Sequence, residues 1–372
     1  DNHAIGQGCF AMVTMKDIAM LAGVSQQAVS SALSGNGNSR VSAEKKEKIL
    51  KLARELNYVP NVSARGLSGS QTHTIGIIGA INGIWQIPLI SEICEILIAK
   101  GYNTMISHYS VSNEYKTRTI VGIVSCGVDG VIIMNSSNKA EIINNLKVPS
   151  VFSSHNHMDG YDVGVDNELT GYIATKHLLE MGHRQVLFLS PMAQTSDIGK
   201  ERLQGWRRAH TERGIDIGKN MIVALRDLDG RADLLIKLLK ERHITAVFAS
   251  NDYVGAKTMR SLFDHGVKVP DDIAVVGCNG QSFIEFCPVS LTTVLQPIRP
   301  QAELTVELLL KRIENHELHS DFADIRIKPQ LWIGGSCGGE ARQVNELFRM
   351  NTFESLEKDA KMNFNRNIIL EE

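Results

Sequence analysis

The sequence predicts a small all-α head followed by a larger α/β body that contains two parallel sheets. In the head, apolar residues between positions 13 and 59 recur at the three- and four-residue spacing of helices. From residue 74 onward, short apolar runs alternate with longer amphipathic segments, which is the order of strands and helices in parallel α/β folds. A chain of 372 residues is long enough for two or three such domains.

Three helix starts and one turn organise the head. Thr14 and Asp17 have the three-residue spacing of a capping box, which marks the start of a helix. Gly23 ends that helix, and Ser25 can cap a second one. After a loop rich in Gly, Asn and Ser, Ser42 can cap a third helix. Two short helices joined by a glycine-containing turn predict a helix-turn-helix.

A linker and a series of strands follow the head. Residues 61–70 are small and polar, which is typical of a linker or of a marginal helix that needs a partner to form. We expect strands at the apolar runs 75–78, 104–107, 131–134, 186–189, 246–249 and 273–277, and helices at 87–100 and 113–125. These strands are too many for one sheet of ordinary size, so two sheets are predicted.

The charge of the chain is unevenly distributed. The whole sequence has a formal net charge of −2. Residues 1–71 contain 8 Lys and Arg against 5 Asp and Glu, whereas the rest of the chain contains 31 against 36. A basic head on a mildly acidic body indicates a polyanion-binding module joined to a second functional unit.

Several classes of protein are disfavoured by what the sequence lacks. The six cysteines include no Cys-x-x-Cys pair, which is typical of reduced thiols in a cytosolic protein. No run of about 18 apolar residues predicts a membrane span. Residues 1–12 lack the features of a signal peptide, and we expect them to be a flexible arm or a non-native remnant. The expected location is therefore the cytoplasm.

Motifs of common enzyme classes are also missing. No Gly-x-Gly-x-x-Gly follows a predicted strand, and no Gly-x-Ser-x-Gly occurs. The segment His316-Glu-Leu-His319 is one residue too short for the zinc pattern His-Glu-x-x-His. We therefore expect no enzyme activity, no metal and no cofactor.

An ordered series of motifs runs through the head and the body. In the head it comprises Val13-Thr-Met-Lys-Asp-Ile-Ala19, Ala22-Gly-Val-Ser25, Val41-Ser42 and Leu56-Asn-Tyr-Val-Pro-Asn61. In the body it comprises Val165-Asp-Asn167, Gly182-His-Arg184, Asn251-Asp252, Val269-Pro-Asp-Asp-Ile-Ala-Val-Val-Gly277 and Leu291-Thr-Thr-Val-Leu-Gln-Pro297. This series resembles the lactose/galactose repressor family over residues 13–338.

The resemblance implies a domain organisation. It implies an all-α helix-turn-helix head with a hinge helix, joined to an α/β periplasmic-binding-protein-like core of two parallel-sheet subdomains. The implied ranges are 13–59 for the head, 60–72 for the hinge and 73–338 for the core. Within the core, the first subdomain comprises 73–177 and 298–325, and the second comprises 178–295 and 326–338. Residues 339–372 form a C-terminal extension to which no role is assigned.

The resemblance places the second helix of the head in the major groove of DNA. Gln26 and Gln27 stand at its start, and a Gln amide can pair with both polar atoms of an adenine edge. Ser31 stands where the family commonly has an Arg that would read guanine, which predicts an altered operator preference. The hydroxyl groups expected to contact phosphate, or only to cap helices, belong to Thr14, Ser25, Ser30 and Ser42.

The hinge helices of the family enter the minor groove of the operator as a pair. The resemblance implies that Leu67 wedges into a central base step, with further contacts from Asn61 and Ala64. The alternative is that Leu67 packs against the body. Two heads on one palindromic site imply a homodimer, and a tetramer is left open.

The cleft of the core is the expected site of a small effector. The resemblance implies contacts from Trp85, Gln86, Ser136, His155, Asp166, Arg202, Asn251 and Asn279. After Gly277 the family usually has an aromatic residue and two Asp, whereas this chain has Cys278-Asn279-Gly280. The loss of these carboxylates predicts either an anionic or phosphorylated ligand or a reduced control by ligand.

These expectations combine into one prediction of function. The chain is predicted to be a transcriptional repressor that binds double-stranded operator DNA as a homodimer. Its operator affinity is expected to depend on a small effector, which is a sugar, a nucleoside or a sugar phosphate. Control by a phosphocarrier protein is one alternative. A sugar-binding receptor is an alternative from another class, and it does not account for the head.

Overall fold

The computed structural model describes residues 13–33, 41–58, 71–79, 86–108, 113–134, 142, 146–154, 161–191, 193, 196–218, 221–224, 231–318 and 323–339. The chain divides into two compact units, residues 1–70 and 71–372. Each unit has its own hydrophobic core among the described residues, as the sequence predicts for a head and a body.

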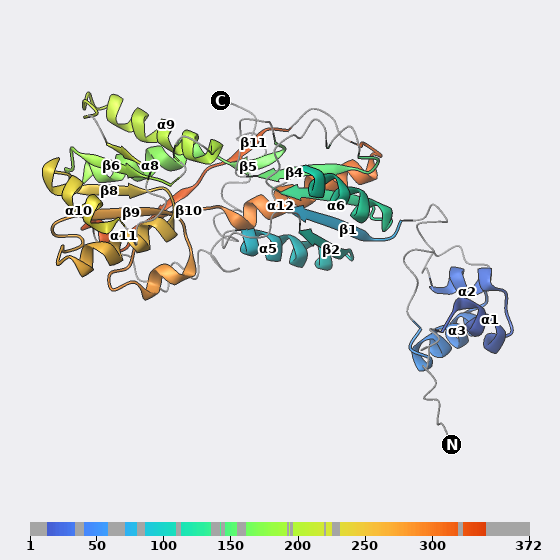
Figure 1. The fold of residues 1–372 in the computed structure, drawn as a ribbon. Coiled ribbons are helices and arrows are strands. Elements are labelled where there is room, and N and C mark those ends of the chain that lie inside the picture. The colour runs from blue at the N-terminus through green and yellow to red at the C-terminus, as the bar shows by residue number, and fades with distance from the viewer. Residues whose placement is uncertain are drawn as a thin grey trace, which may run out of the picture. The chain divides into compact units, whose positions relative to one another are not determined.

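The described part of the first unit contains the helices α1 (Met15–Ala22), α2 (Gln26–Leu33) and α3 (Ala43–Glu55) (Figure 1). Its core contains one fully buried branched residue from each helix, namely Ile18, Val29 and Ile49. Gly23 ends α1 with a φ of 68°, a left-handed conformation that favours glycine. The predicted helix-turn-helix is therefore confirmed.

The described residues of the second unit form two six-stranded sheets. The first has the order β11-β5-β4-β3-β1-β2, with β1 (Thr74–Gly79), β2 (Asn103–His108), β3 (Gly130–Met134), β4 (Ser150–Ser154), β5 (Val163–Val165) and β11 (Ile325–Ile327). The second has the order β12-β10-β9-β8-β6-β7, with β6 (Val186–Leu189), β7 (Ile222–Val223), β8 (Ala246–Ala249), β9 (Ala274–Asn279), β10 (Thr292–Leu295) and β12 (Gln330–Trp332). Neighbouring strands are parallel except for β10 and β12.

Helices pack on both sheets (Figure 1). The first sheet carries α5 (Gln86–Ala99), α6 (Asn113–Ser125) and α12 (Ile298–Glu314). The second carries α8 (Asn167–Glu180), α9 (Asp197–Thr211), α10 (Ala232–Glu241) and α11 (Asp252–Asp264), followed by short 3₁₀ turns η1 (Ser282–Phe286) and η2 (Gly335–Cys337). None of the helices in the described ranges is long and apolar enough to span a membrane.

Along the described strands, the chain crosses from one sheet to the other three times. These crossings follow β5, β10 and β11. Helix α8 packs Ala174 and Leu178 into the core of the second sheet, so the first crossing lies near residue 166 and not near 177 as predicted. Strand β11 pairs with β5 in the first sheet, so the last crossing follows Ile327 and not residue 325. A helical period does not reveal which sheet the helix covers, and this explains the error.

A buried ion pair holds α12 against the first sheet. Arg312 is 2% exposed, and its Nη1 and Nη2 donate to the two carboxylate oxygens of Asp162 at 3.0 and 2.6 Å. The backbone N–H groups of Phe152 and Ala323 donate to the same carboxylate at 2.8 and 3.2 Å. Because the carboxylate is bidentate and its remaining lone pairs are used, the pair can offset the cost of removing both charges from water.

Candidate functional site

Helix α2 has one buried face and one exposed face. Val29 and Ala32 are 0% and 2% exposed and pack in the core of the head. Gln26, Gln27 and Ser30 lie on the exposed side, and Ser31 is half-buried. The side chains predicted to read bases therefore face solvent, on a helix whose apolar face is packed in the core of the head.

The hydroxyl groups of the head differ in whether their own O–H already donates a hydrogen bond within the protein. Thr14 accepts from the N–H of Asp17 at 3.4 Å, and its own O–H donates to the Asp17 carboxylate at 2.7 Å. Hydrogen bonds from the Thr14 side chain and backbone lower the pKa of Asp17. Ser25 and Ser42 accept a backbone N–H from the residue three positions later, at 3.2 and 3.5 Å. A capping serine still has an O–H that can donate to a phosphate oxygen.

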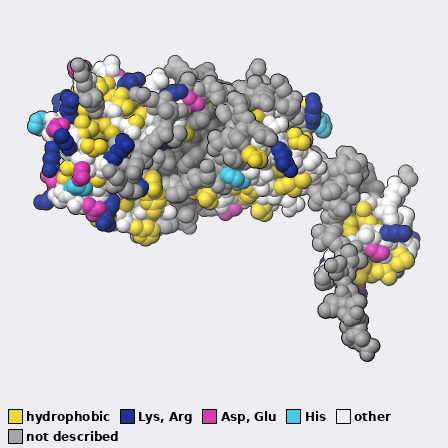
Figure 2. Space-filling model, in the orientation of Figure 1, with side chains coloured by type: hydrophobic (Ala, Val, Ile, Leu, Met, Phe, Trp, Pro, Cys, Tyr) yellow, Lys and Arg dark blue, Asp and Glu magenta, His cyan; other side chains and the backbone are white. Residues whose placement is uncertain are grey.

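Basic and apolar side chains are both visible on the described part of the head in Figure 2. The exposed apolar residues of α1 are Met20 and Leu21, at 74% and 51%. The predicted hinge contacts Asn61, Ala64 and Leu67 lie outside the described residues.

Two glycines bring α8 and α9 into backbone contact in the second subdomain. A Cβ added to Gly171 would lie 2.0 Å from the carbonyl oxygen of Arg202, and one added to Gly205 would lie 1.9 Å from that of Glu168. No other residue fits at either position without moving a helix. This close approach puts Arg202 at the first turn of α8.

The guanidinium of Arg202 joins three segments at the carboxyl ends of the strands. It is 3% exposed and donates from Nε to Asn167 Oδ1 at 3.0 Å, from Nη2 to Asn279 Oδ1 at 3.3 Å, and from Nη1 to the carbonyl of Ser250. Asn167 starts α8, Ser250 follows β8, and Asn279 ends β9. Because ligands of open parallel sheets bind at this edge, Arg202 is the centre of the candidate site.

The network continues from Asn279 to the end of β10. The thiol of Cys278 donates to Asn279 Oδ1 at 3.4 Å, and Gln296 Nε2 donates to Cys278 Sγ at 3.3 Å. Burial raises the pKa of Cys278 to about 12, so the thiol is neutral. Asn279 has a φ of 124°, which is unfavourable for a residue with a side chain. We call Asn167, Arg202, Ser250, Cys278, Asn279 and Gln296 the Arg202 cluster.

A buried carboxyl, that of Asp252, lies close to this cluster and was not among the predicted site residues. Asp252 is fully buried and accepts from Thr293 Oγ1 at 2.6 Å and from the N–H of Gln281 at 2.8 Å. Burial raises its pKa to about 6, against the opposing effects of these hydrogen bonds and of Arg202. A Cβ at Gly277 would lie 2.5 Å from Asp252 Oδ1, so the glycine before Cys278 makes room for the carboxyl. The adjacent Asn251-Asp252 motif was the available signal.

Two other predicted effector contacts cap helices beside the cluster. Asp166 Oδ1 accepts from the N–H of Leu169 at 2.7 Å and caps α8. Asn251 Oδ1 accepts from the N–H of Val254 at 2.9 Å and caps α11. These oxygens orient the helices from which the site is built, and the second polar atom of each side chain is not part of the cap.

The first subdomain contributes one described candidate. Gln86 begins α5, is 2% exposed, and its Oε1 has no hydrogen-bond donor among the described residues. Trp85, Ser136 and His155 lie outside the described residues. The described geometry of the site is therefore almost wholly that of the second subdomain.

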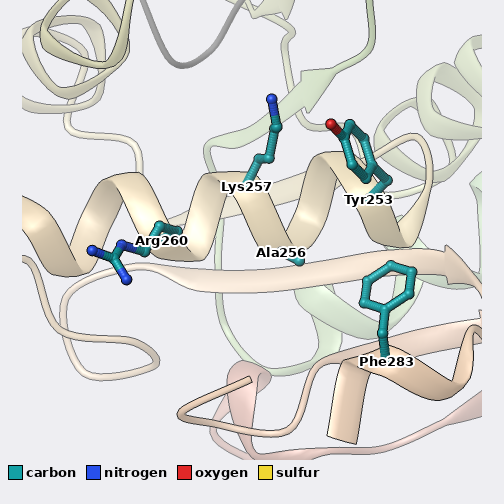
Figure 3. Close-up of a pocket in the computed structure, with 5 residues that line it drawn as sticks. All are labelled: Tyr253, Ala256, Lys257, Arg260 and Phe283. Atoms are coloured by element: carbon teal, nitrogen blue, oxygen red, sulfur yellow. The ribbon is translucent and has the colours of Figure 1, made fainter. Parts of the chain in front are cut away.

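A separate cavity of about 400 Å³ lies between α11 and η1 (Figure 3). Tyr253, Ala256, Lys257, Arg260 and Phe283 line it. The Nζ of Lys257 lies 5.1 Å from the centre of the Tyr253 ring. None of the predicted effector contacts lines this cavity, so it is distinct from the Arg202 cluster.

A helix-turn-helix with a solvent-facing second helix, followed by a two-sheet core with a buried polar cluster at its strand ends, defines a DNA-binding regulator with a ligand-binding core. Comparisons with known proteins support each half. Residues 14–61 match the model of bacterial regulatory proteins of the lacI family, and residues 175–337 match a periplasmic binding protein-like domain.

Relatives match along most of the chain. The HTH-type transcriptional regulator MalR of Clostridium butyricum is 33% identical, over 81% of this chain and 93% of that protein. A CelR–cellobiose complex is 25% identical with a TM-score of 0.63, covering 87% of this chain and 99% of the other. A Lac repressor dimer bound to operator shares the fold, with a TM-score of 0.72 at 24% identity over 88% of this chain and 99% of the other. The chain belongs to the LacI family of bacterial transcriptional regulators.

The contact between α8 and α9 predicts a large effect of one added methyl group. Gly205→Ala should destabilise the protein by about 1–3 kcal/mol, because its Cβ would meet the backbone of α8. Gly122→Ala is the matched control, because α6 has open space at this position and alanine favours a helix. Urea unfolding measures both, and equal stabilities of the two variants would contradict the packing described above.

The buried carboxyl predicts a pH dependence of stability. The folded pKa of Asp252, about 6, lies above its ordinary value of 3.8, so the folded state holds this proton more tightly. Its stabilising contribution is present below pH 3.8 and is lost as the pH rises to about 6. Relative to Asp252→Asn, the wild-type protein should lose about 2 kcal/mol between pH 4 and pH 7. Urea unfolding across this range tests it, and a constant difference between the two proteins would refute it.

Proposed function

We propose that this protein is a transcriptional repressor that binds a palindromic operator as a homodimer, under the control of a small carbohydrate-type effector. The observation that carries this proposal is the presence, in one chain, of exposed Gln26 and Gln27 on an anchored helix and of a buried arginine cluster at the strand ends of the core. A receptor that only binds sugar would account for the core but not for the head.

The proposed DNA interface has two parts. Gln26 and Gln27 read adenine edges in the major groove, while Ser25, Ser30 and Ser42 donate to phosphate oxygens around them. Asn61, Ala64 and Leu67 form the minor-groove part, with Leu67 as the wedge. Thr14 contributes through the capping box, because its hydroxyl proton is used by Asp17.

The proposed effector site is centred on the Arg202 cluster. Arg202 and Asn279 supply the central contacts, and Gln86 supplies one from the first subdomain. Asp166 and Asn251 border the site as helix caps, and Trp85, Ser136 and His155 complete it in the proposal. The cellobiose complex of the related regulator CelR supports a carbohydrate-type ligand.

Control of DNA binding follows from where the cluster lies in the chain. Asn167 directly follows the first crossing between the sheets, and Gln296 directly precedes the second. A ligand held by Arg202 therefore acts on two of the segments that join the subdomains. An effector changes operator affinity when it binds the two arrangements of these segments with different affinity.

The relatives named above are regulators, and this chain is proposed to act on DNA in the cytoplasm without enzyme activity. The solved Lac repressor dimer on its operator supports the homodimer. A two-fold dimer matches a palindrome because each head reads one half-site.

Selection of duplexes from a random pool tests the proposed DNA reading. At about 0.15 M salt, the protein should enrich a palindrome of about 14–20 base pairs. Gln26→Ala should weaken binding to that palindrome by about 10- to 100-fold, because each lost base contact removes about 1–3 kcal/mol of discrimination. Binding to unrelated DNA should not change.

The matched control is Gln204→Ala, which removes an exposed amide on α9, in the core and outside the proposed DNA interface. Fluorescence anisotropy at one salt concentration measures the six affinities of the wild type and the two variants for the palindrome and for unrelated DNA. If Gln26→Ala lowers the affinity for the palindrome and for unrelated DNA by the same factor, Gln26 does not read bases.

A further inference from the structure

In the described part of the chain, two arginines are buried in different electrostatic settings. Arg312 is 2% exposed and forms a bidentate pair with Asp162, which is itself fully buried. Arg202 is 3% exposed, and in the described part of the chain no carboxylate forms an ion pair with it. Arg312 has the partner that a buried guanidinium requires for stability, and Arg202 does not.

Neutral oxygens accept the hydrogen bonds of Arg202. They are the side-chain amides of Asn167 and Asn279 and the backbone carbonyl of Ser250. These bonds use three of the five N–H groups of the guanidinium. One N–H therefore remains on each terminal nitrogen, and such N–H groups can donate to a carboxylate or a phosphate.

The buried carboxyl that the charge of Arg202 reaches serves other partners. Both oxygens of Asp252 accept hydrogen bonds, from Thr293 and from the backbone of Gln281, and the charge of Arg202 acts on this carboxyl without a hydrogen bond. The position that Nη2 of Arg202 reaches is an amide, Asn279, where an aspartate would have completed an ion pair.

The cluster also contains an acceptor that lacks a donor. Gln296 is 4% exposed, and its Nε2 is used by Cys278. Its Oε1 has no hydrogen-bond donor among the described residues. Leaving a buried amide oxygen unpaired is costly, and a ligand hydroxyl would remove that cost.

We propose that the effector of this protein is a sugar that carries a carboxylate or phosphate group, bound through that group to Arg202. The proposal rests on the proposed function of the Arg202 cluster and narrows it to anionic ligands. The anion completes the ion pair that Asn279 leaves open, and a hydroxyl of the same ligand donates to Gln296. An aspartate at position 279 would take the place of the anion.

Asn279→Asp is the direct test, because it supplies the missing carboxylate within the chain. Without ligand, this variant should melt about 3 °C or more above the wild type, since Arg202 gains an anionic partner. Asn103→Asp is the matched control, because it adds the same charge at an exposed position of β2 and should leave the melting temperature unchanged.

Four probes at equal ionic strength complete the test: inorganic phosphate, glucose 6-phosphate, galacturonate and glucose. We expect at least one of the three anions to raise the melting temperature of the wild type and of Asn103→Asp. The same anion should bind Asn279→Asp about 100-fold more weakly. Glucose 6-phosphate and galacturonate distinguish a phosphate from a carboxylate as the bound group.

Three results would overturn the proposal. Glucose could raise the melting temperature of the wild type as much as the anions do, or none of the anions could raise it. The third is that Asn279→Asp melts at a lower temperature than the wild type. If neutral glucose instead changes the affinity for the selected palindrome, the proposed regulator stands and only the anionic ligand fails. If no palindrome is selected, the proposed function itself fails.

Discussion

The close contact between α8 and α9 is the constraint on which the ligand-binding end of the core depends. Gly171 and Gly205 allow the two helix backbones to touch, and this contact places the guanidinium of Arg202 among the ends of the strands. A guanidinium has five donors in one rigid plane, so it can hold several segments at once. Arg202 holds Asn167 directly, and the hydrogen-bonded chain of the cluster ends at Gln296. The same charge thus organises both the site and the segments that join the subdomains.

The buried arginines of the two subdomains have different hydrogen-bond partners. In the first, Arg312 and Asp162 neutralise each other and tie α12 to the sheet. In the second, Arg202 donates to two side-chain amides and a backbone carbonyl, and the buried carboxyl of Asp252 is held by other donors. The anion proposed for this site would form the ion pair that Arg202 lacks, and its binding would therefore stabilise the core. Such a difference between states is what couples a ligand to DNA binding.

Much of the architecture could be predicted from local pattern, because helix caps and apolar periods act over a few residues. The capping box of Thr14 and the helix at 113–125 are confirmed, and so is each predicted strand run. Assignment of α8 to the second sheet could not be predicted, since it depends on which core receives Ala174 and Leu178. The burial of Asp252 was missed for the same reason. Asp166 and Asn251 show a further limit, because the residue types that bind ligands also cap helices.

The most direct measurement is the affinity for the selected palindrome as the anion that stabilises the wild type is added, in the wild type and in Arg202→Gln. We expect the ligand to change the wild-type affinity by about 5- to 150-fold, the usual range of allosteric coupling. The Arg202→Gln variant should bind the palindrome but should not respond to the ligand. An equal response of both proteins would contradict the claim that Arg202 connects the effector to the DNA.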